Sequence, residues 1–168
     1  PTGRTMKRND WCLKDGEYHL TVLGVVARPD HKFLITKRVM TKAWAPGCWE
    51  VSGGAAQAGE ESREAVLREV KEETGVSASI IKYIGKSSYS FNTPQDMVEK
   101  DVHWYLMMAD SYYSKPQREE HFVDSGYYKF YEAYHLLKFS NEKQILEKAY
   151  NEYRDLKKAN LWGSKKYF

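Results

Sequence analysis

The chain has 168 residues, a length typical of one domain that buries a large apolar core without disulfides. Its formal net charge is only +3, and basic residues interleave with acidic ones, which argues against a dedicated nucleic-acid surface or a membrane-binding face. Cys12 and Cys48 have neither metal-site nor disulfide spacing, and no apolar run reaches the length of a signal peptide or a transmembrane helix. We therefore expect one cytoplasmic domain over residues 1–168 and, because no initiator methionine is present, a natural protein that begins further upstream.

The first part of the sequence predicts an arm followed by a β-hairpin. Residues 1–16 mix Gly, Arg, Lys, Asn and Asp without periodicity, which suits an extended arm. Residues 18–27 are apolar and β-branched, residues 29–31 have turn composition, and residues 32–37 suit a second strand. His19 falls at the start of the first strand, where a histidine serves more often as a structural hydrogen-bonding group than as a ligand.

The next segment combines basic side chains with a short strand that leads to two glycines. Arg38 and Lys42 lie in the loop after the hairpin, and residues 49–52 predict a strand that delivers Gly53 and Gly54. The missing side chains of these glycines allow the backbone to approach a metal ion or a phosphate. Basic side chains near a phosphate neutralise its charge, so we favour a phosphate contact for Arg38. Lys42 is equally compatible with a plain surface charge.

Residues 60–74 give the strongest helix prediction in the chain. They contain no proline or glycine, good helix formers dominate, and Gly75 follows where a left-handed cap is favoured. At about 100° per residue, Glu69, Glu72 and Glu73 share one face of this helix. Like charges at this spacing destabilise a helix by about a few tenths of a kcal/mol per pair. They therefore indicate either a solvated acidic surface or a bound cation, and Mg²⁺ is a natural partner for carboxylate oxygens.

The segment GAAQAGEESREAVLREVKEETGV, residues 54–76, resembles the Nudix box at every fixed position. The residues that fill those positions are Gly54, Glu60, Arg68, Glu69, Val70, Glu72, Glu73, Gly75 and Val76. By this resemblance the chain is identified as a member of the Nudix hydrolase superfamily. The resemblance implies a Nudix-type α/β/α sandwich with a mixed central sheet, in which a strand, a glycine loop and this helix present a divalent metal ion to a pyrophosphate.

The resemblance also implies roles for individual residues. The implied ligands of Mg²⁺ or Mn²⁺ are Glu69 and Glu73 as principal ligands, Glu72 as a further ligand or base, and the Gly53 carbonyl as a neutral ligand. Arg68 is similar to the structural arginine that orients these carboxylates, and Glu60 to the partner of that arginine. The Nudix box is a small part of the chain, so the substrate has to be argued from other residues.

The sequence after this helix alternates strands with polar connections. Strands are predicted at residues 77–91 and 102–108, and the polar residues 92–100 suit either a loop that closes over substrate or an ordinary hairpin connection. The remaining predicted elements are a long polar loop at 111–124, a strand at 127–131, a short helix at 132–137 and a C-terminal helix at 141–159. The aromatic side chains of the last helix suit packing on the sheet and would also serve a homodimer contact.

The Nudix box leaves the general base open, because in that family the base is either a box glutamate or a glutamate from a later loop. The favoured pair is Glu119 and Glu120, since their loop is long enough to close on substrate and has basic neighbours. Glu99 with Asp101 is the second pair by position. The alternative for Glu119 and Glu120 is a solvated acidic turn, in which case Glu72 is the candidate base and the loop is ordinary surface.

The expected function is metal-dependent hydrolysis of a diphosphate linkage in a nucleoside diphosphate derivative, a small nucleotide-like substrate. One alternative is an isomerase of isopentenyl diphosphate, because the lead-in segments TGRTMKR and GEYHLTVLGVVA resemble that family. That family has a cysteine in a segment like WTNSVCGHP, where this chain has WEVSGGAAQ, so the isomerase is disfavoured. A nucleotide-sensing binding module is also disfavoured, because the box is intact. The loops that select among diphosphate substrates carry no readable code.

Overall fold

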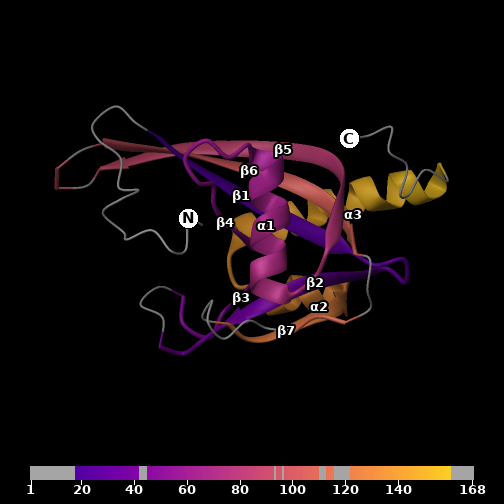
Figure 1. Ribbon diagram of the computed structural model, residues 1–168. Coiled ribbons are helices and arrows are strands. Elements are labelled where there is room, and N and C mark those ends of the chain that lie inside the picture. The colour runs from indigo at the N-terminus through magenta and orange to yellow at the C-terminus, as the bar shows by residue number, and fades with distance from the viewer. Residues whose placement is uncertain are drawn as a thin grey trace.

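The structure, a computed structural model, describes residues 18–41, 45–92, 94–95, 97–109, 113–115 and 122–159 (Figure 1). The elements in this part of the chain are β1 (Tyr18–Ala27), β2 (Lys32–Arg38), β3 (Trp49–Glu50), β4 (Ser52–Ala55), α1 (Ser62–Thr74), β5 (Ala78–Asn92), β6 (Met97–Ala109), β7 (Phe122–Lys129), α2 (Phe130–Leu136) and α3 (Ser140–Lys158). The strands join in one sheet in the order β3-β2-β1-β6-β5, and β4 and β7 pair with β1 and β2 respectively.

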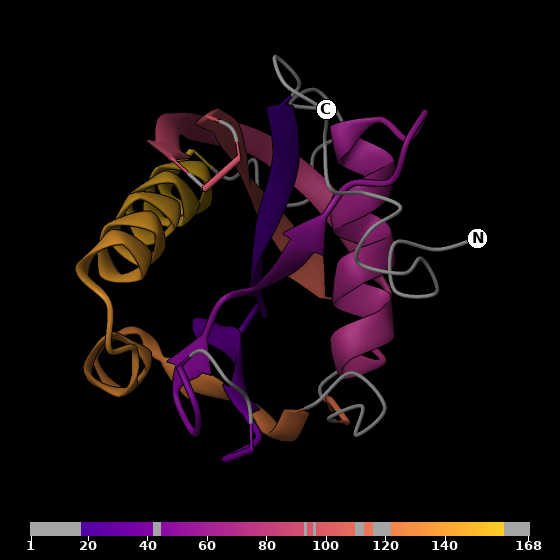
Figure 2. The same cartoon turned by 90° about the vertical axis from the view of Figure 1, so that its left-hand side faces the viewer.

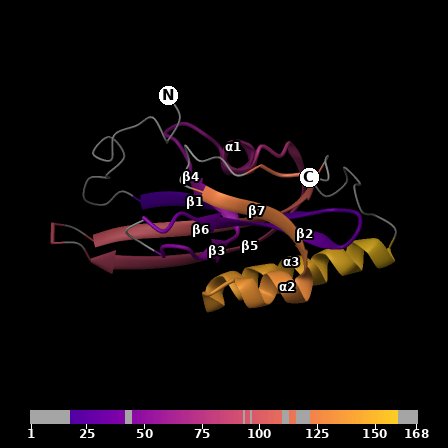
Figure 3. The same ribbon diagram turned by 90° about the horizontal axis from the view of Figure 1, so that it is seen from below.

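β1 is the central strand of this sheet. It pairs in parallel with β6, from Tyr18 opposite Glu99 to Ala27 opposite Met108, and it pairs antiparallel with β2 and β4. α1 covers one face of the sheet, whereas α2 and α3 cover the opposite face (Figure 2, Figure 3). The expected α/β/α sandwich with a mixed central sheet is therefore confirmed.

Each helix layer buries its apolar face in a core of its own. On one side of the sheet, Val66 and Val70 of α1 pack against β1 and β6. On the other side, α3 buries Tyr153 completely, and the Tyr153 ring meets Phe33 of β2 edge to face with 5.7 Å between ring centroids. The sheet lies between the two cores, so any coupling between α1 and α3 passes through its strands.

β5 and β6 form a longer hairpin than the sequence predicts. β5 extends to Asn92 and β6 begins at Met97, so most of the predicted connection at 92–100 is strand, and the hairpin alternative is confirmed. β6 pairs with β5 on one side and β1 on the other. The ladder hydrogen bonds on both sides stabilise Glu99, Lys100 and Asp101 in β6, although none of these three side chains is buried in the core.

The predicted strand at 127–131 has the wrong bounds. β7 covers Phe122–Lys129, so residues 122–124 of the polar loop predicted at 111–124 are strand, and α2 begins at Phe130. β7 pairs with β2 along its whole length, which brings Asp124, Ser125 and Gly126 into the sheet although their local preference for strand is low. α3 begins at Ser140, slightly earlier than predicted.

Candidate active site

The two glycines before α1 lie within strand β4 rather than in the expected glycine loop. β4 pairs with β1 so that Gly53 is opposite Leu23 and Gly54 is opposite Val22. A Cβ atom on Gly53 would lie 2.0 Å from the carbonyl oxygen of Val22, and a Cβ atom on Gly54 would lie 2.7 Å from Cδ of Glu69. Neither position has room for a side chain, and the glycine at position 54 brings β4 directly against a carboxylate of α1.

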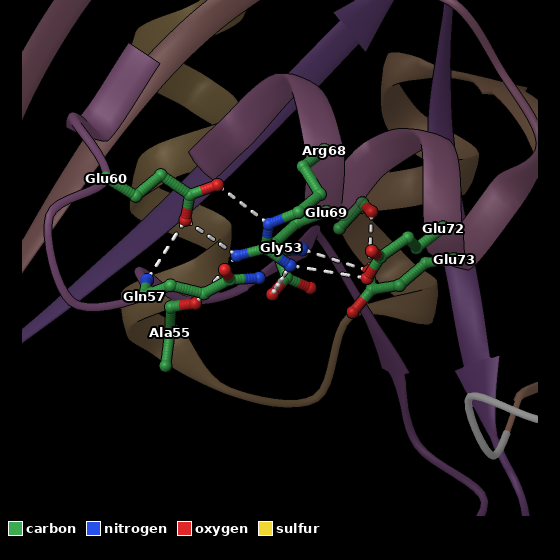
Figure 4. Close-up of polar contacts among 9 residues, drawn as sticks. Gly53, Ala55, Gln57, Glu60, Arg68, Glu69, Glu72 and Glu73 are labelled. Atoms are coloured by element: carbon green, nitrogen blue, oxygen red, sulfur yellow. Dashed lines mark hydrogen bonds and ion pairs between the residues drawn. The ribbon is translucent and has the colours of Figure 1, made fainter. Parts of the chain in front are cut away.

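Glu69 and Glu73 lie one turn apart on α1 and face β4 (Figure 4). Each residue is only 2% exposed. Glu73 Oε2 accepts hydrogen bonds from Ser52 Oγ at 2.6 Å and from the Gly53 N–H at 3.1 Å. Buried carboxylates need such donors, because burial without them is costly. The alternative of a solvated acidic face is therefore wrong for these two glutamates.

Arg68 connects three glutamates with the main chain of β4 (Figure 4). Its Nε and Nη2 atoms donate to the Glu60 carboxylate at 2.8 and 2.9 Å, and Nη2 also donates to the Ala55 carbonyl at 3.1 Å. Its Nη1 atom donates to Glu69 at 3.0 Å and to Glu72 at 3.2 Å. The hydrogen bonds between Arg68 and Glu60 are the main cause that raises the pKa of Arg68 and lowers the pKa of Glu60. Both groups stay charged at neutral pH, and the planar guanidinium fixes the direction of the carboxylates.

The donor atoms gathered here are those that hard divalent cations prefer. Carboxylate oxygens of Glu69, Glu72 and Glu73 with the Gly53 carbonyl match Mg²⁺ or Mn²⁺ by donor type. In the described part of the chain, no group of three or more His, Cys, Asp or Glu side chains converges as a metal-ion site. Arg68 and β4 contact the carboxylates instead. The residues fit such an ion by chemistry and burial, and their role as ligands stays a prediction.

Arg38 at the end of β2 forms an ion pair with Glu50 of β3. Its Nη1 atom lies 3.1 and 3.2 Å from the two carboxylate oxygens of Glu50, and the side chains are only 14% and 16% exposed. Arg38 is therefore not a plain surface charge, and a phosphate bound there would share the guanidinium with Glu50. The other residues predicted from the loops, which lie outside the described residues, are Lys42, Glu119 and Glu120.

The second pair considered as general base lies along β6, away from the buried carboxylates. Asp101 is opposite Leu20 of β1 and Glu99 is further along the strand, whereas Gly53 is opposite Leu23. At roughly 3.3 Å per strand residue, Asp101 is displaced from the level of Gly53 by about 10 Å. The structure does not bring this pair together with the glutamates of α1.

Three residues with polar contacts to the site or its supporting strands were not predicted from the sequence: Ser52, Glu50 and Glu142. Ser52 is fully buried and donates to Glu73, and its position directly before two glycines in a strand was the available signal. Glu142 accepts a hydrogen bond from the Val51 N–H across a separation of 91 residues. No local spacing could have indicated that contact, because only the tertiary fold creates it.

Comparisons with known proteins agree with this geometry. The family model of the NUDIX domain matches residues 17–149. An uncharacterized Nudix hydrolase from Listeria innocua is 38% identical over 94 residues, which cover 54% of this chain and 56% of the relative. The chain thus spans a little more than half the length of that relative.

Two solved structures illustrate the similarity of the fold. The MutT protein from Methanosarcina mazei Go1 has a TM-score of 0.60 and 20% identity, with 84% of this chain and 99% of that chain covered. A NUDIX hydrolase from Nitrosomonas europaea has a TM-score of 0.63 and 18% identity, with 81% of this chain and 90% of that chain covered. These two likenesses concern the fold alone, whereas the family model covers most of the sequence, including every residue of the site described above. The chain therefore belongs to the Nudix family.

Proposed function

We propose that the protein hydrolyses a diphosphate linkage in a nucleoside diphosphate derivative and that it depends on Mg²⁺ or Mn²⁺. The observation that carries this proposal is the buried pair Glu69 and Glu73, which Arg68 and β4 hold in place. Two buried carboxylates one turn apart repel each other, and a divalent cation offsets both charges. Membership of the Nudix family supports the same class of substrate.

Each residue of the site has a defined task in this proposal. The residues that would hold the ion are Glu69, Glu73, Glu72 and the carbonyl of Gly53. When bound, the ion neutralises charge on the diphosphate and polarises the attacking water. Arg38 donates to a phosphate oxygen, and its ion pair with Glu50 keeps the guanidinium directed. A glutamate accepts the proton of the water.

A substrate panel tests this function. Nucleoside triphosphates, dinucleotides, nucleotide sugars and capped RNA are incubated with the protein, with and without Mg²⁺ or Mn²⁺, and the products are separated by chromatography. We expect cleavage of at least one class, and only with a divalent ion. Folded protein that cleaves no member of the panel would overturn the proposal. Isopentenyl diphosphate is included as a negative substrate, because glycines occupy the region where the isomerase needs a thiol.

Arg68→Lys is expected to lower kcat/KM by about 10- to 100-fold although the charge is kept. A lysine ammonium is a single point charge and cannot hold Glu60, Glu69 and Glu72 in fixed directions at once. Steady-state kinetics on the best panel substrate measure the effect, and Arg63→Lys on the exposed side of α1 is the matched control. An Arg68→Lys enzyme as active as this control would contradict the orienting role.

Glu120→Gln is expected to lower kcat by about 10²- to 10⁴-fold while Mg²⁺ affinity stays nearly unchanged, if Glu120 is the general base. Glu119→Gln is made in parallel, because the two glutamates are neighbours in the same loop. Kinetics at several Mg²⁺ concentrations separate turnover from metal affinity. Normal turnover in both variants would transfer the role to Glu72.

Two further expectations are tested by other measurements. No helix in the described ranges is long and apolar enough to cross a membrane. We propose a cytoplasmic enzyme, which localisation of a tagged protein would test.

A homodimer contact through α3 stays a prediction, and light scattering of the purified protein would decide it.

A further inference from the structure

Three consecutive residues, Val51, Ser52 and Gly53, bridge the two helix layers of the protein. On the α1 side, Ser52 and Gly53 donate to Glu73 Oε2. On the opposite side, the Val51 N–H donates to Glu142 Oε1 of α3 at 3.0 Å. The two helices lie on opposite faces of the sheet (Figure 3), so this short segment is hydrogen-bonded to both of them.

The contact with Glu142 meets a specific need of the backbone. Val51 lies between the end of β3 and the start of β4 and is only 2% exposed. A buried backbone N–H without an acceptor is costly, and neighbouring strands normally supply that acceptor. Here a side chain from the first turn of α3 supplies it instead.

The surroundings of Glu142 favour a structural acceptor over an ionised group. Burial raises the pKa of Glu142 to about 8, with a smaller raising effect from the charge of Glu50. The hydrogen bond from Val51 and the charge of Arg38 act in the lowering direction. The geometry requires only that Oε1 accept from the backbone, which both the carboxyl and the carboxylate form of Glu142 can do.

We propose that Glu142 is a positioning residue for the metal-ligand segment. By fixing Val51 from the opposite helix layer, it sets where Ser52 and Gly53 lie against Glu73. A displacement of about 1 Å at reacting groups can lower the rate by about 10²-fold. Loss of the hydrogen bond between Val51 and Glu142 can therefore lower the rate although neither residue contacts the substrate. The inference rests on the proposed function for its catalytic consequence, but the positioning itself is a property of the protein without metal.

Tyr153 of the same helix provides a matched control. It is fully buried, and its hydroxyl donates to the carbonyl of Arg28 at 3.3 Å and contacts Nδ1 of His31 at 3.0 Å. Like Glu142, it links α3 to a distant backbone segment. That segment is the turn between β1 and β2, which carries none of the proposed ligands. Tyr153→Phe therefore removes a comparable contact of α3 without touching the segment from Val51 to Gly53.

The test compares Glu142→Met, Glu142→Ala, Glu142→Gln and Tyr153→Phe in the full chain. Amide hydrogen exchange and chemical shifts of Val51, Ser52 and Gly53 are measured by NMR in metal-free protein, and Mn²⁺ affinity is measured by electron paramagnetic resonance. In Glu142→Met we expect exchange at Val51 to rise about tenfold, as for one lost hydrogen bond, and the Gly53 amide resonance to move. We expect Mn²⁺ binding to weaken by about 10- to 100-fold. Glu142→Gln should keep the exchange at Val51, the Gly53 resonance and the Mn²⁺ affinity close to those of the wild type, because its amide oxygen accepts the same hydrogen bond.

Two results would overturn the proposal. One is that Glu142→Met, or Glu142→Ala if the Met variant does not fold, leaves the Gly53 resonance and the Mn²⁺ affinity unchanged. The other is that Tyr153→Phe changes them as much, since that would indicate a general loss of stability. The exchange measurement needs neither substrate nor metal. A protein that cleaves nothing in the panel but shows the Gly53 shift would lose the proposed function and keep the positioning role.

Discussion

Glu73→Gln and Glu69→Gln are each expected to lower kcat/KM by at least about 10²-fold. Mutation of a residue that only hydrogen-bonds a metal ligand already lowers metal affinity or activity by about 10- to 100-fold, and these two residues are the proposed ligands themselves. Each change removes a negative oxygen donor from a buried pair. Both variants are expected to fold, since the amide oxygen of glutamine can still accept from Ser52 and Gly53 at position 73. Kinetics over a range of Mg²⁺ concentrations and Mn²⁺ binding by electron paramagnetic resonance measure the effect.

The control for these variants is Glu64→Gln, which removes one charge from the exposed first turn of α1. It should retain wild-type kinetics and Mn²⁺ affinity. Circular dichroism and thermal unfolding in metal-free buffer establish that all three proteins are folded. If Glu69→Gln and Glu73→Gln both bind Mn²⁺ and turn over like Glu64→Gln, the two buried glutamates are not the ligands.

Gly54→Ala is the second change with a large expected effect. The new Cβ atom would lie 2.7 Å from both Cδ and Oε2 of Glu69, and 2.8 Å from Oε1. Either Glu69 turns away or β4 moves from α1, and both displace the proposed ligands. We expect kcat/KM to fall by at least about 10²-fold, with weaker Mn²⁺ binding. The same kinetic and spectroscopic measurements apply.

Gly59→Ala separates this steric effect from a general loss of stability. Gly59 has φ +80°, so alanine is strained there, but nothing lies within 4 Å of its added Cβ atom. The free energy of unfolding of this variant should fall by about 1 kcal/mol. At temperatures below the unfolding transition, its kcat/KM should equal that of the wild type. Equal activity losses in Gly54→Ala and Gly59→Ala would argue that a general loss of stability, rather than the contact with Glu69, causes the effect.

The cluster around α1 could be predicted because its geometry is mostly local. Helical periodicity places Glu69, Glu72 and Glu73 on one face, and the resemblance to the Nudix box implies the pairing of Arg68 with Glu60, which lies within the same segment. The sequence pattern did not distinguish a glycine loop from a glycine strand. That distinction depends on the pairing of β4 with β1, whose residues lie far away in the chain.

Contacts that cross the sheet could not be predicted. Asp124, Ser125 and Gly126 of β7 have little preference for strand, and their pairing with β2 makes them part of one. The same holds for Glu99, Lys100 and Asp101 of β6, which pair with β1 on one side and β5 on the other. Glu142 is an extreme case, because its partner Val51 is 91 residues away and the contact is with the backbone. A single sequence contains no periodicity that reports such a contact.

The parallel pairing of β1 with β6 has a consequence for the order in which the protein folds. The paired residues are about eighty positions apart, whereas β5 and β6 follow one another in the sequence, with Asn92 opposite Met97. Closing a long loop costs more entropy than closing a short one, so hairpins are expected to form before the central strand finds its parallel neighbour. During synthesis on the ribosome, β1 can complete its pairing with β6 only after residue 109 has emerged. The hydrogen bond between Val51 and Glu142 can form only later, when α3 has emerged. The carboxylate cluster is therefore expected to reach its final arrangement among the last steps of folding, after most of its own segment has been synthesised and has begun to form helix.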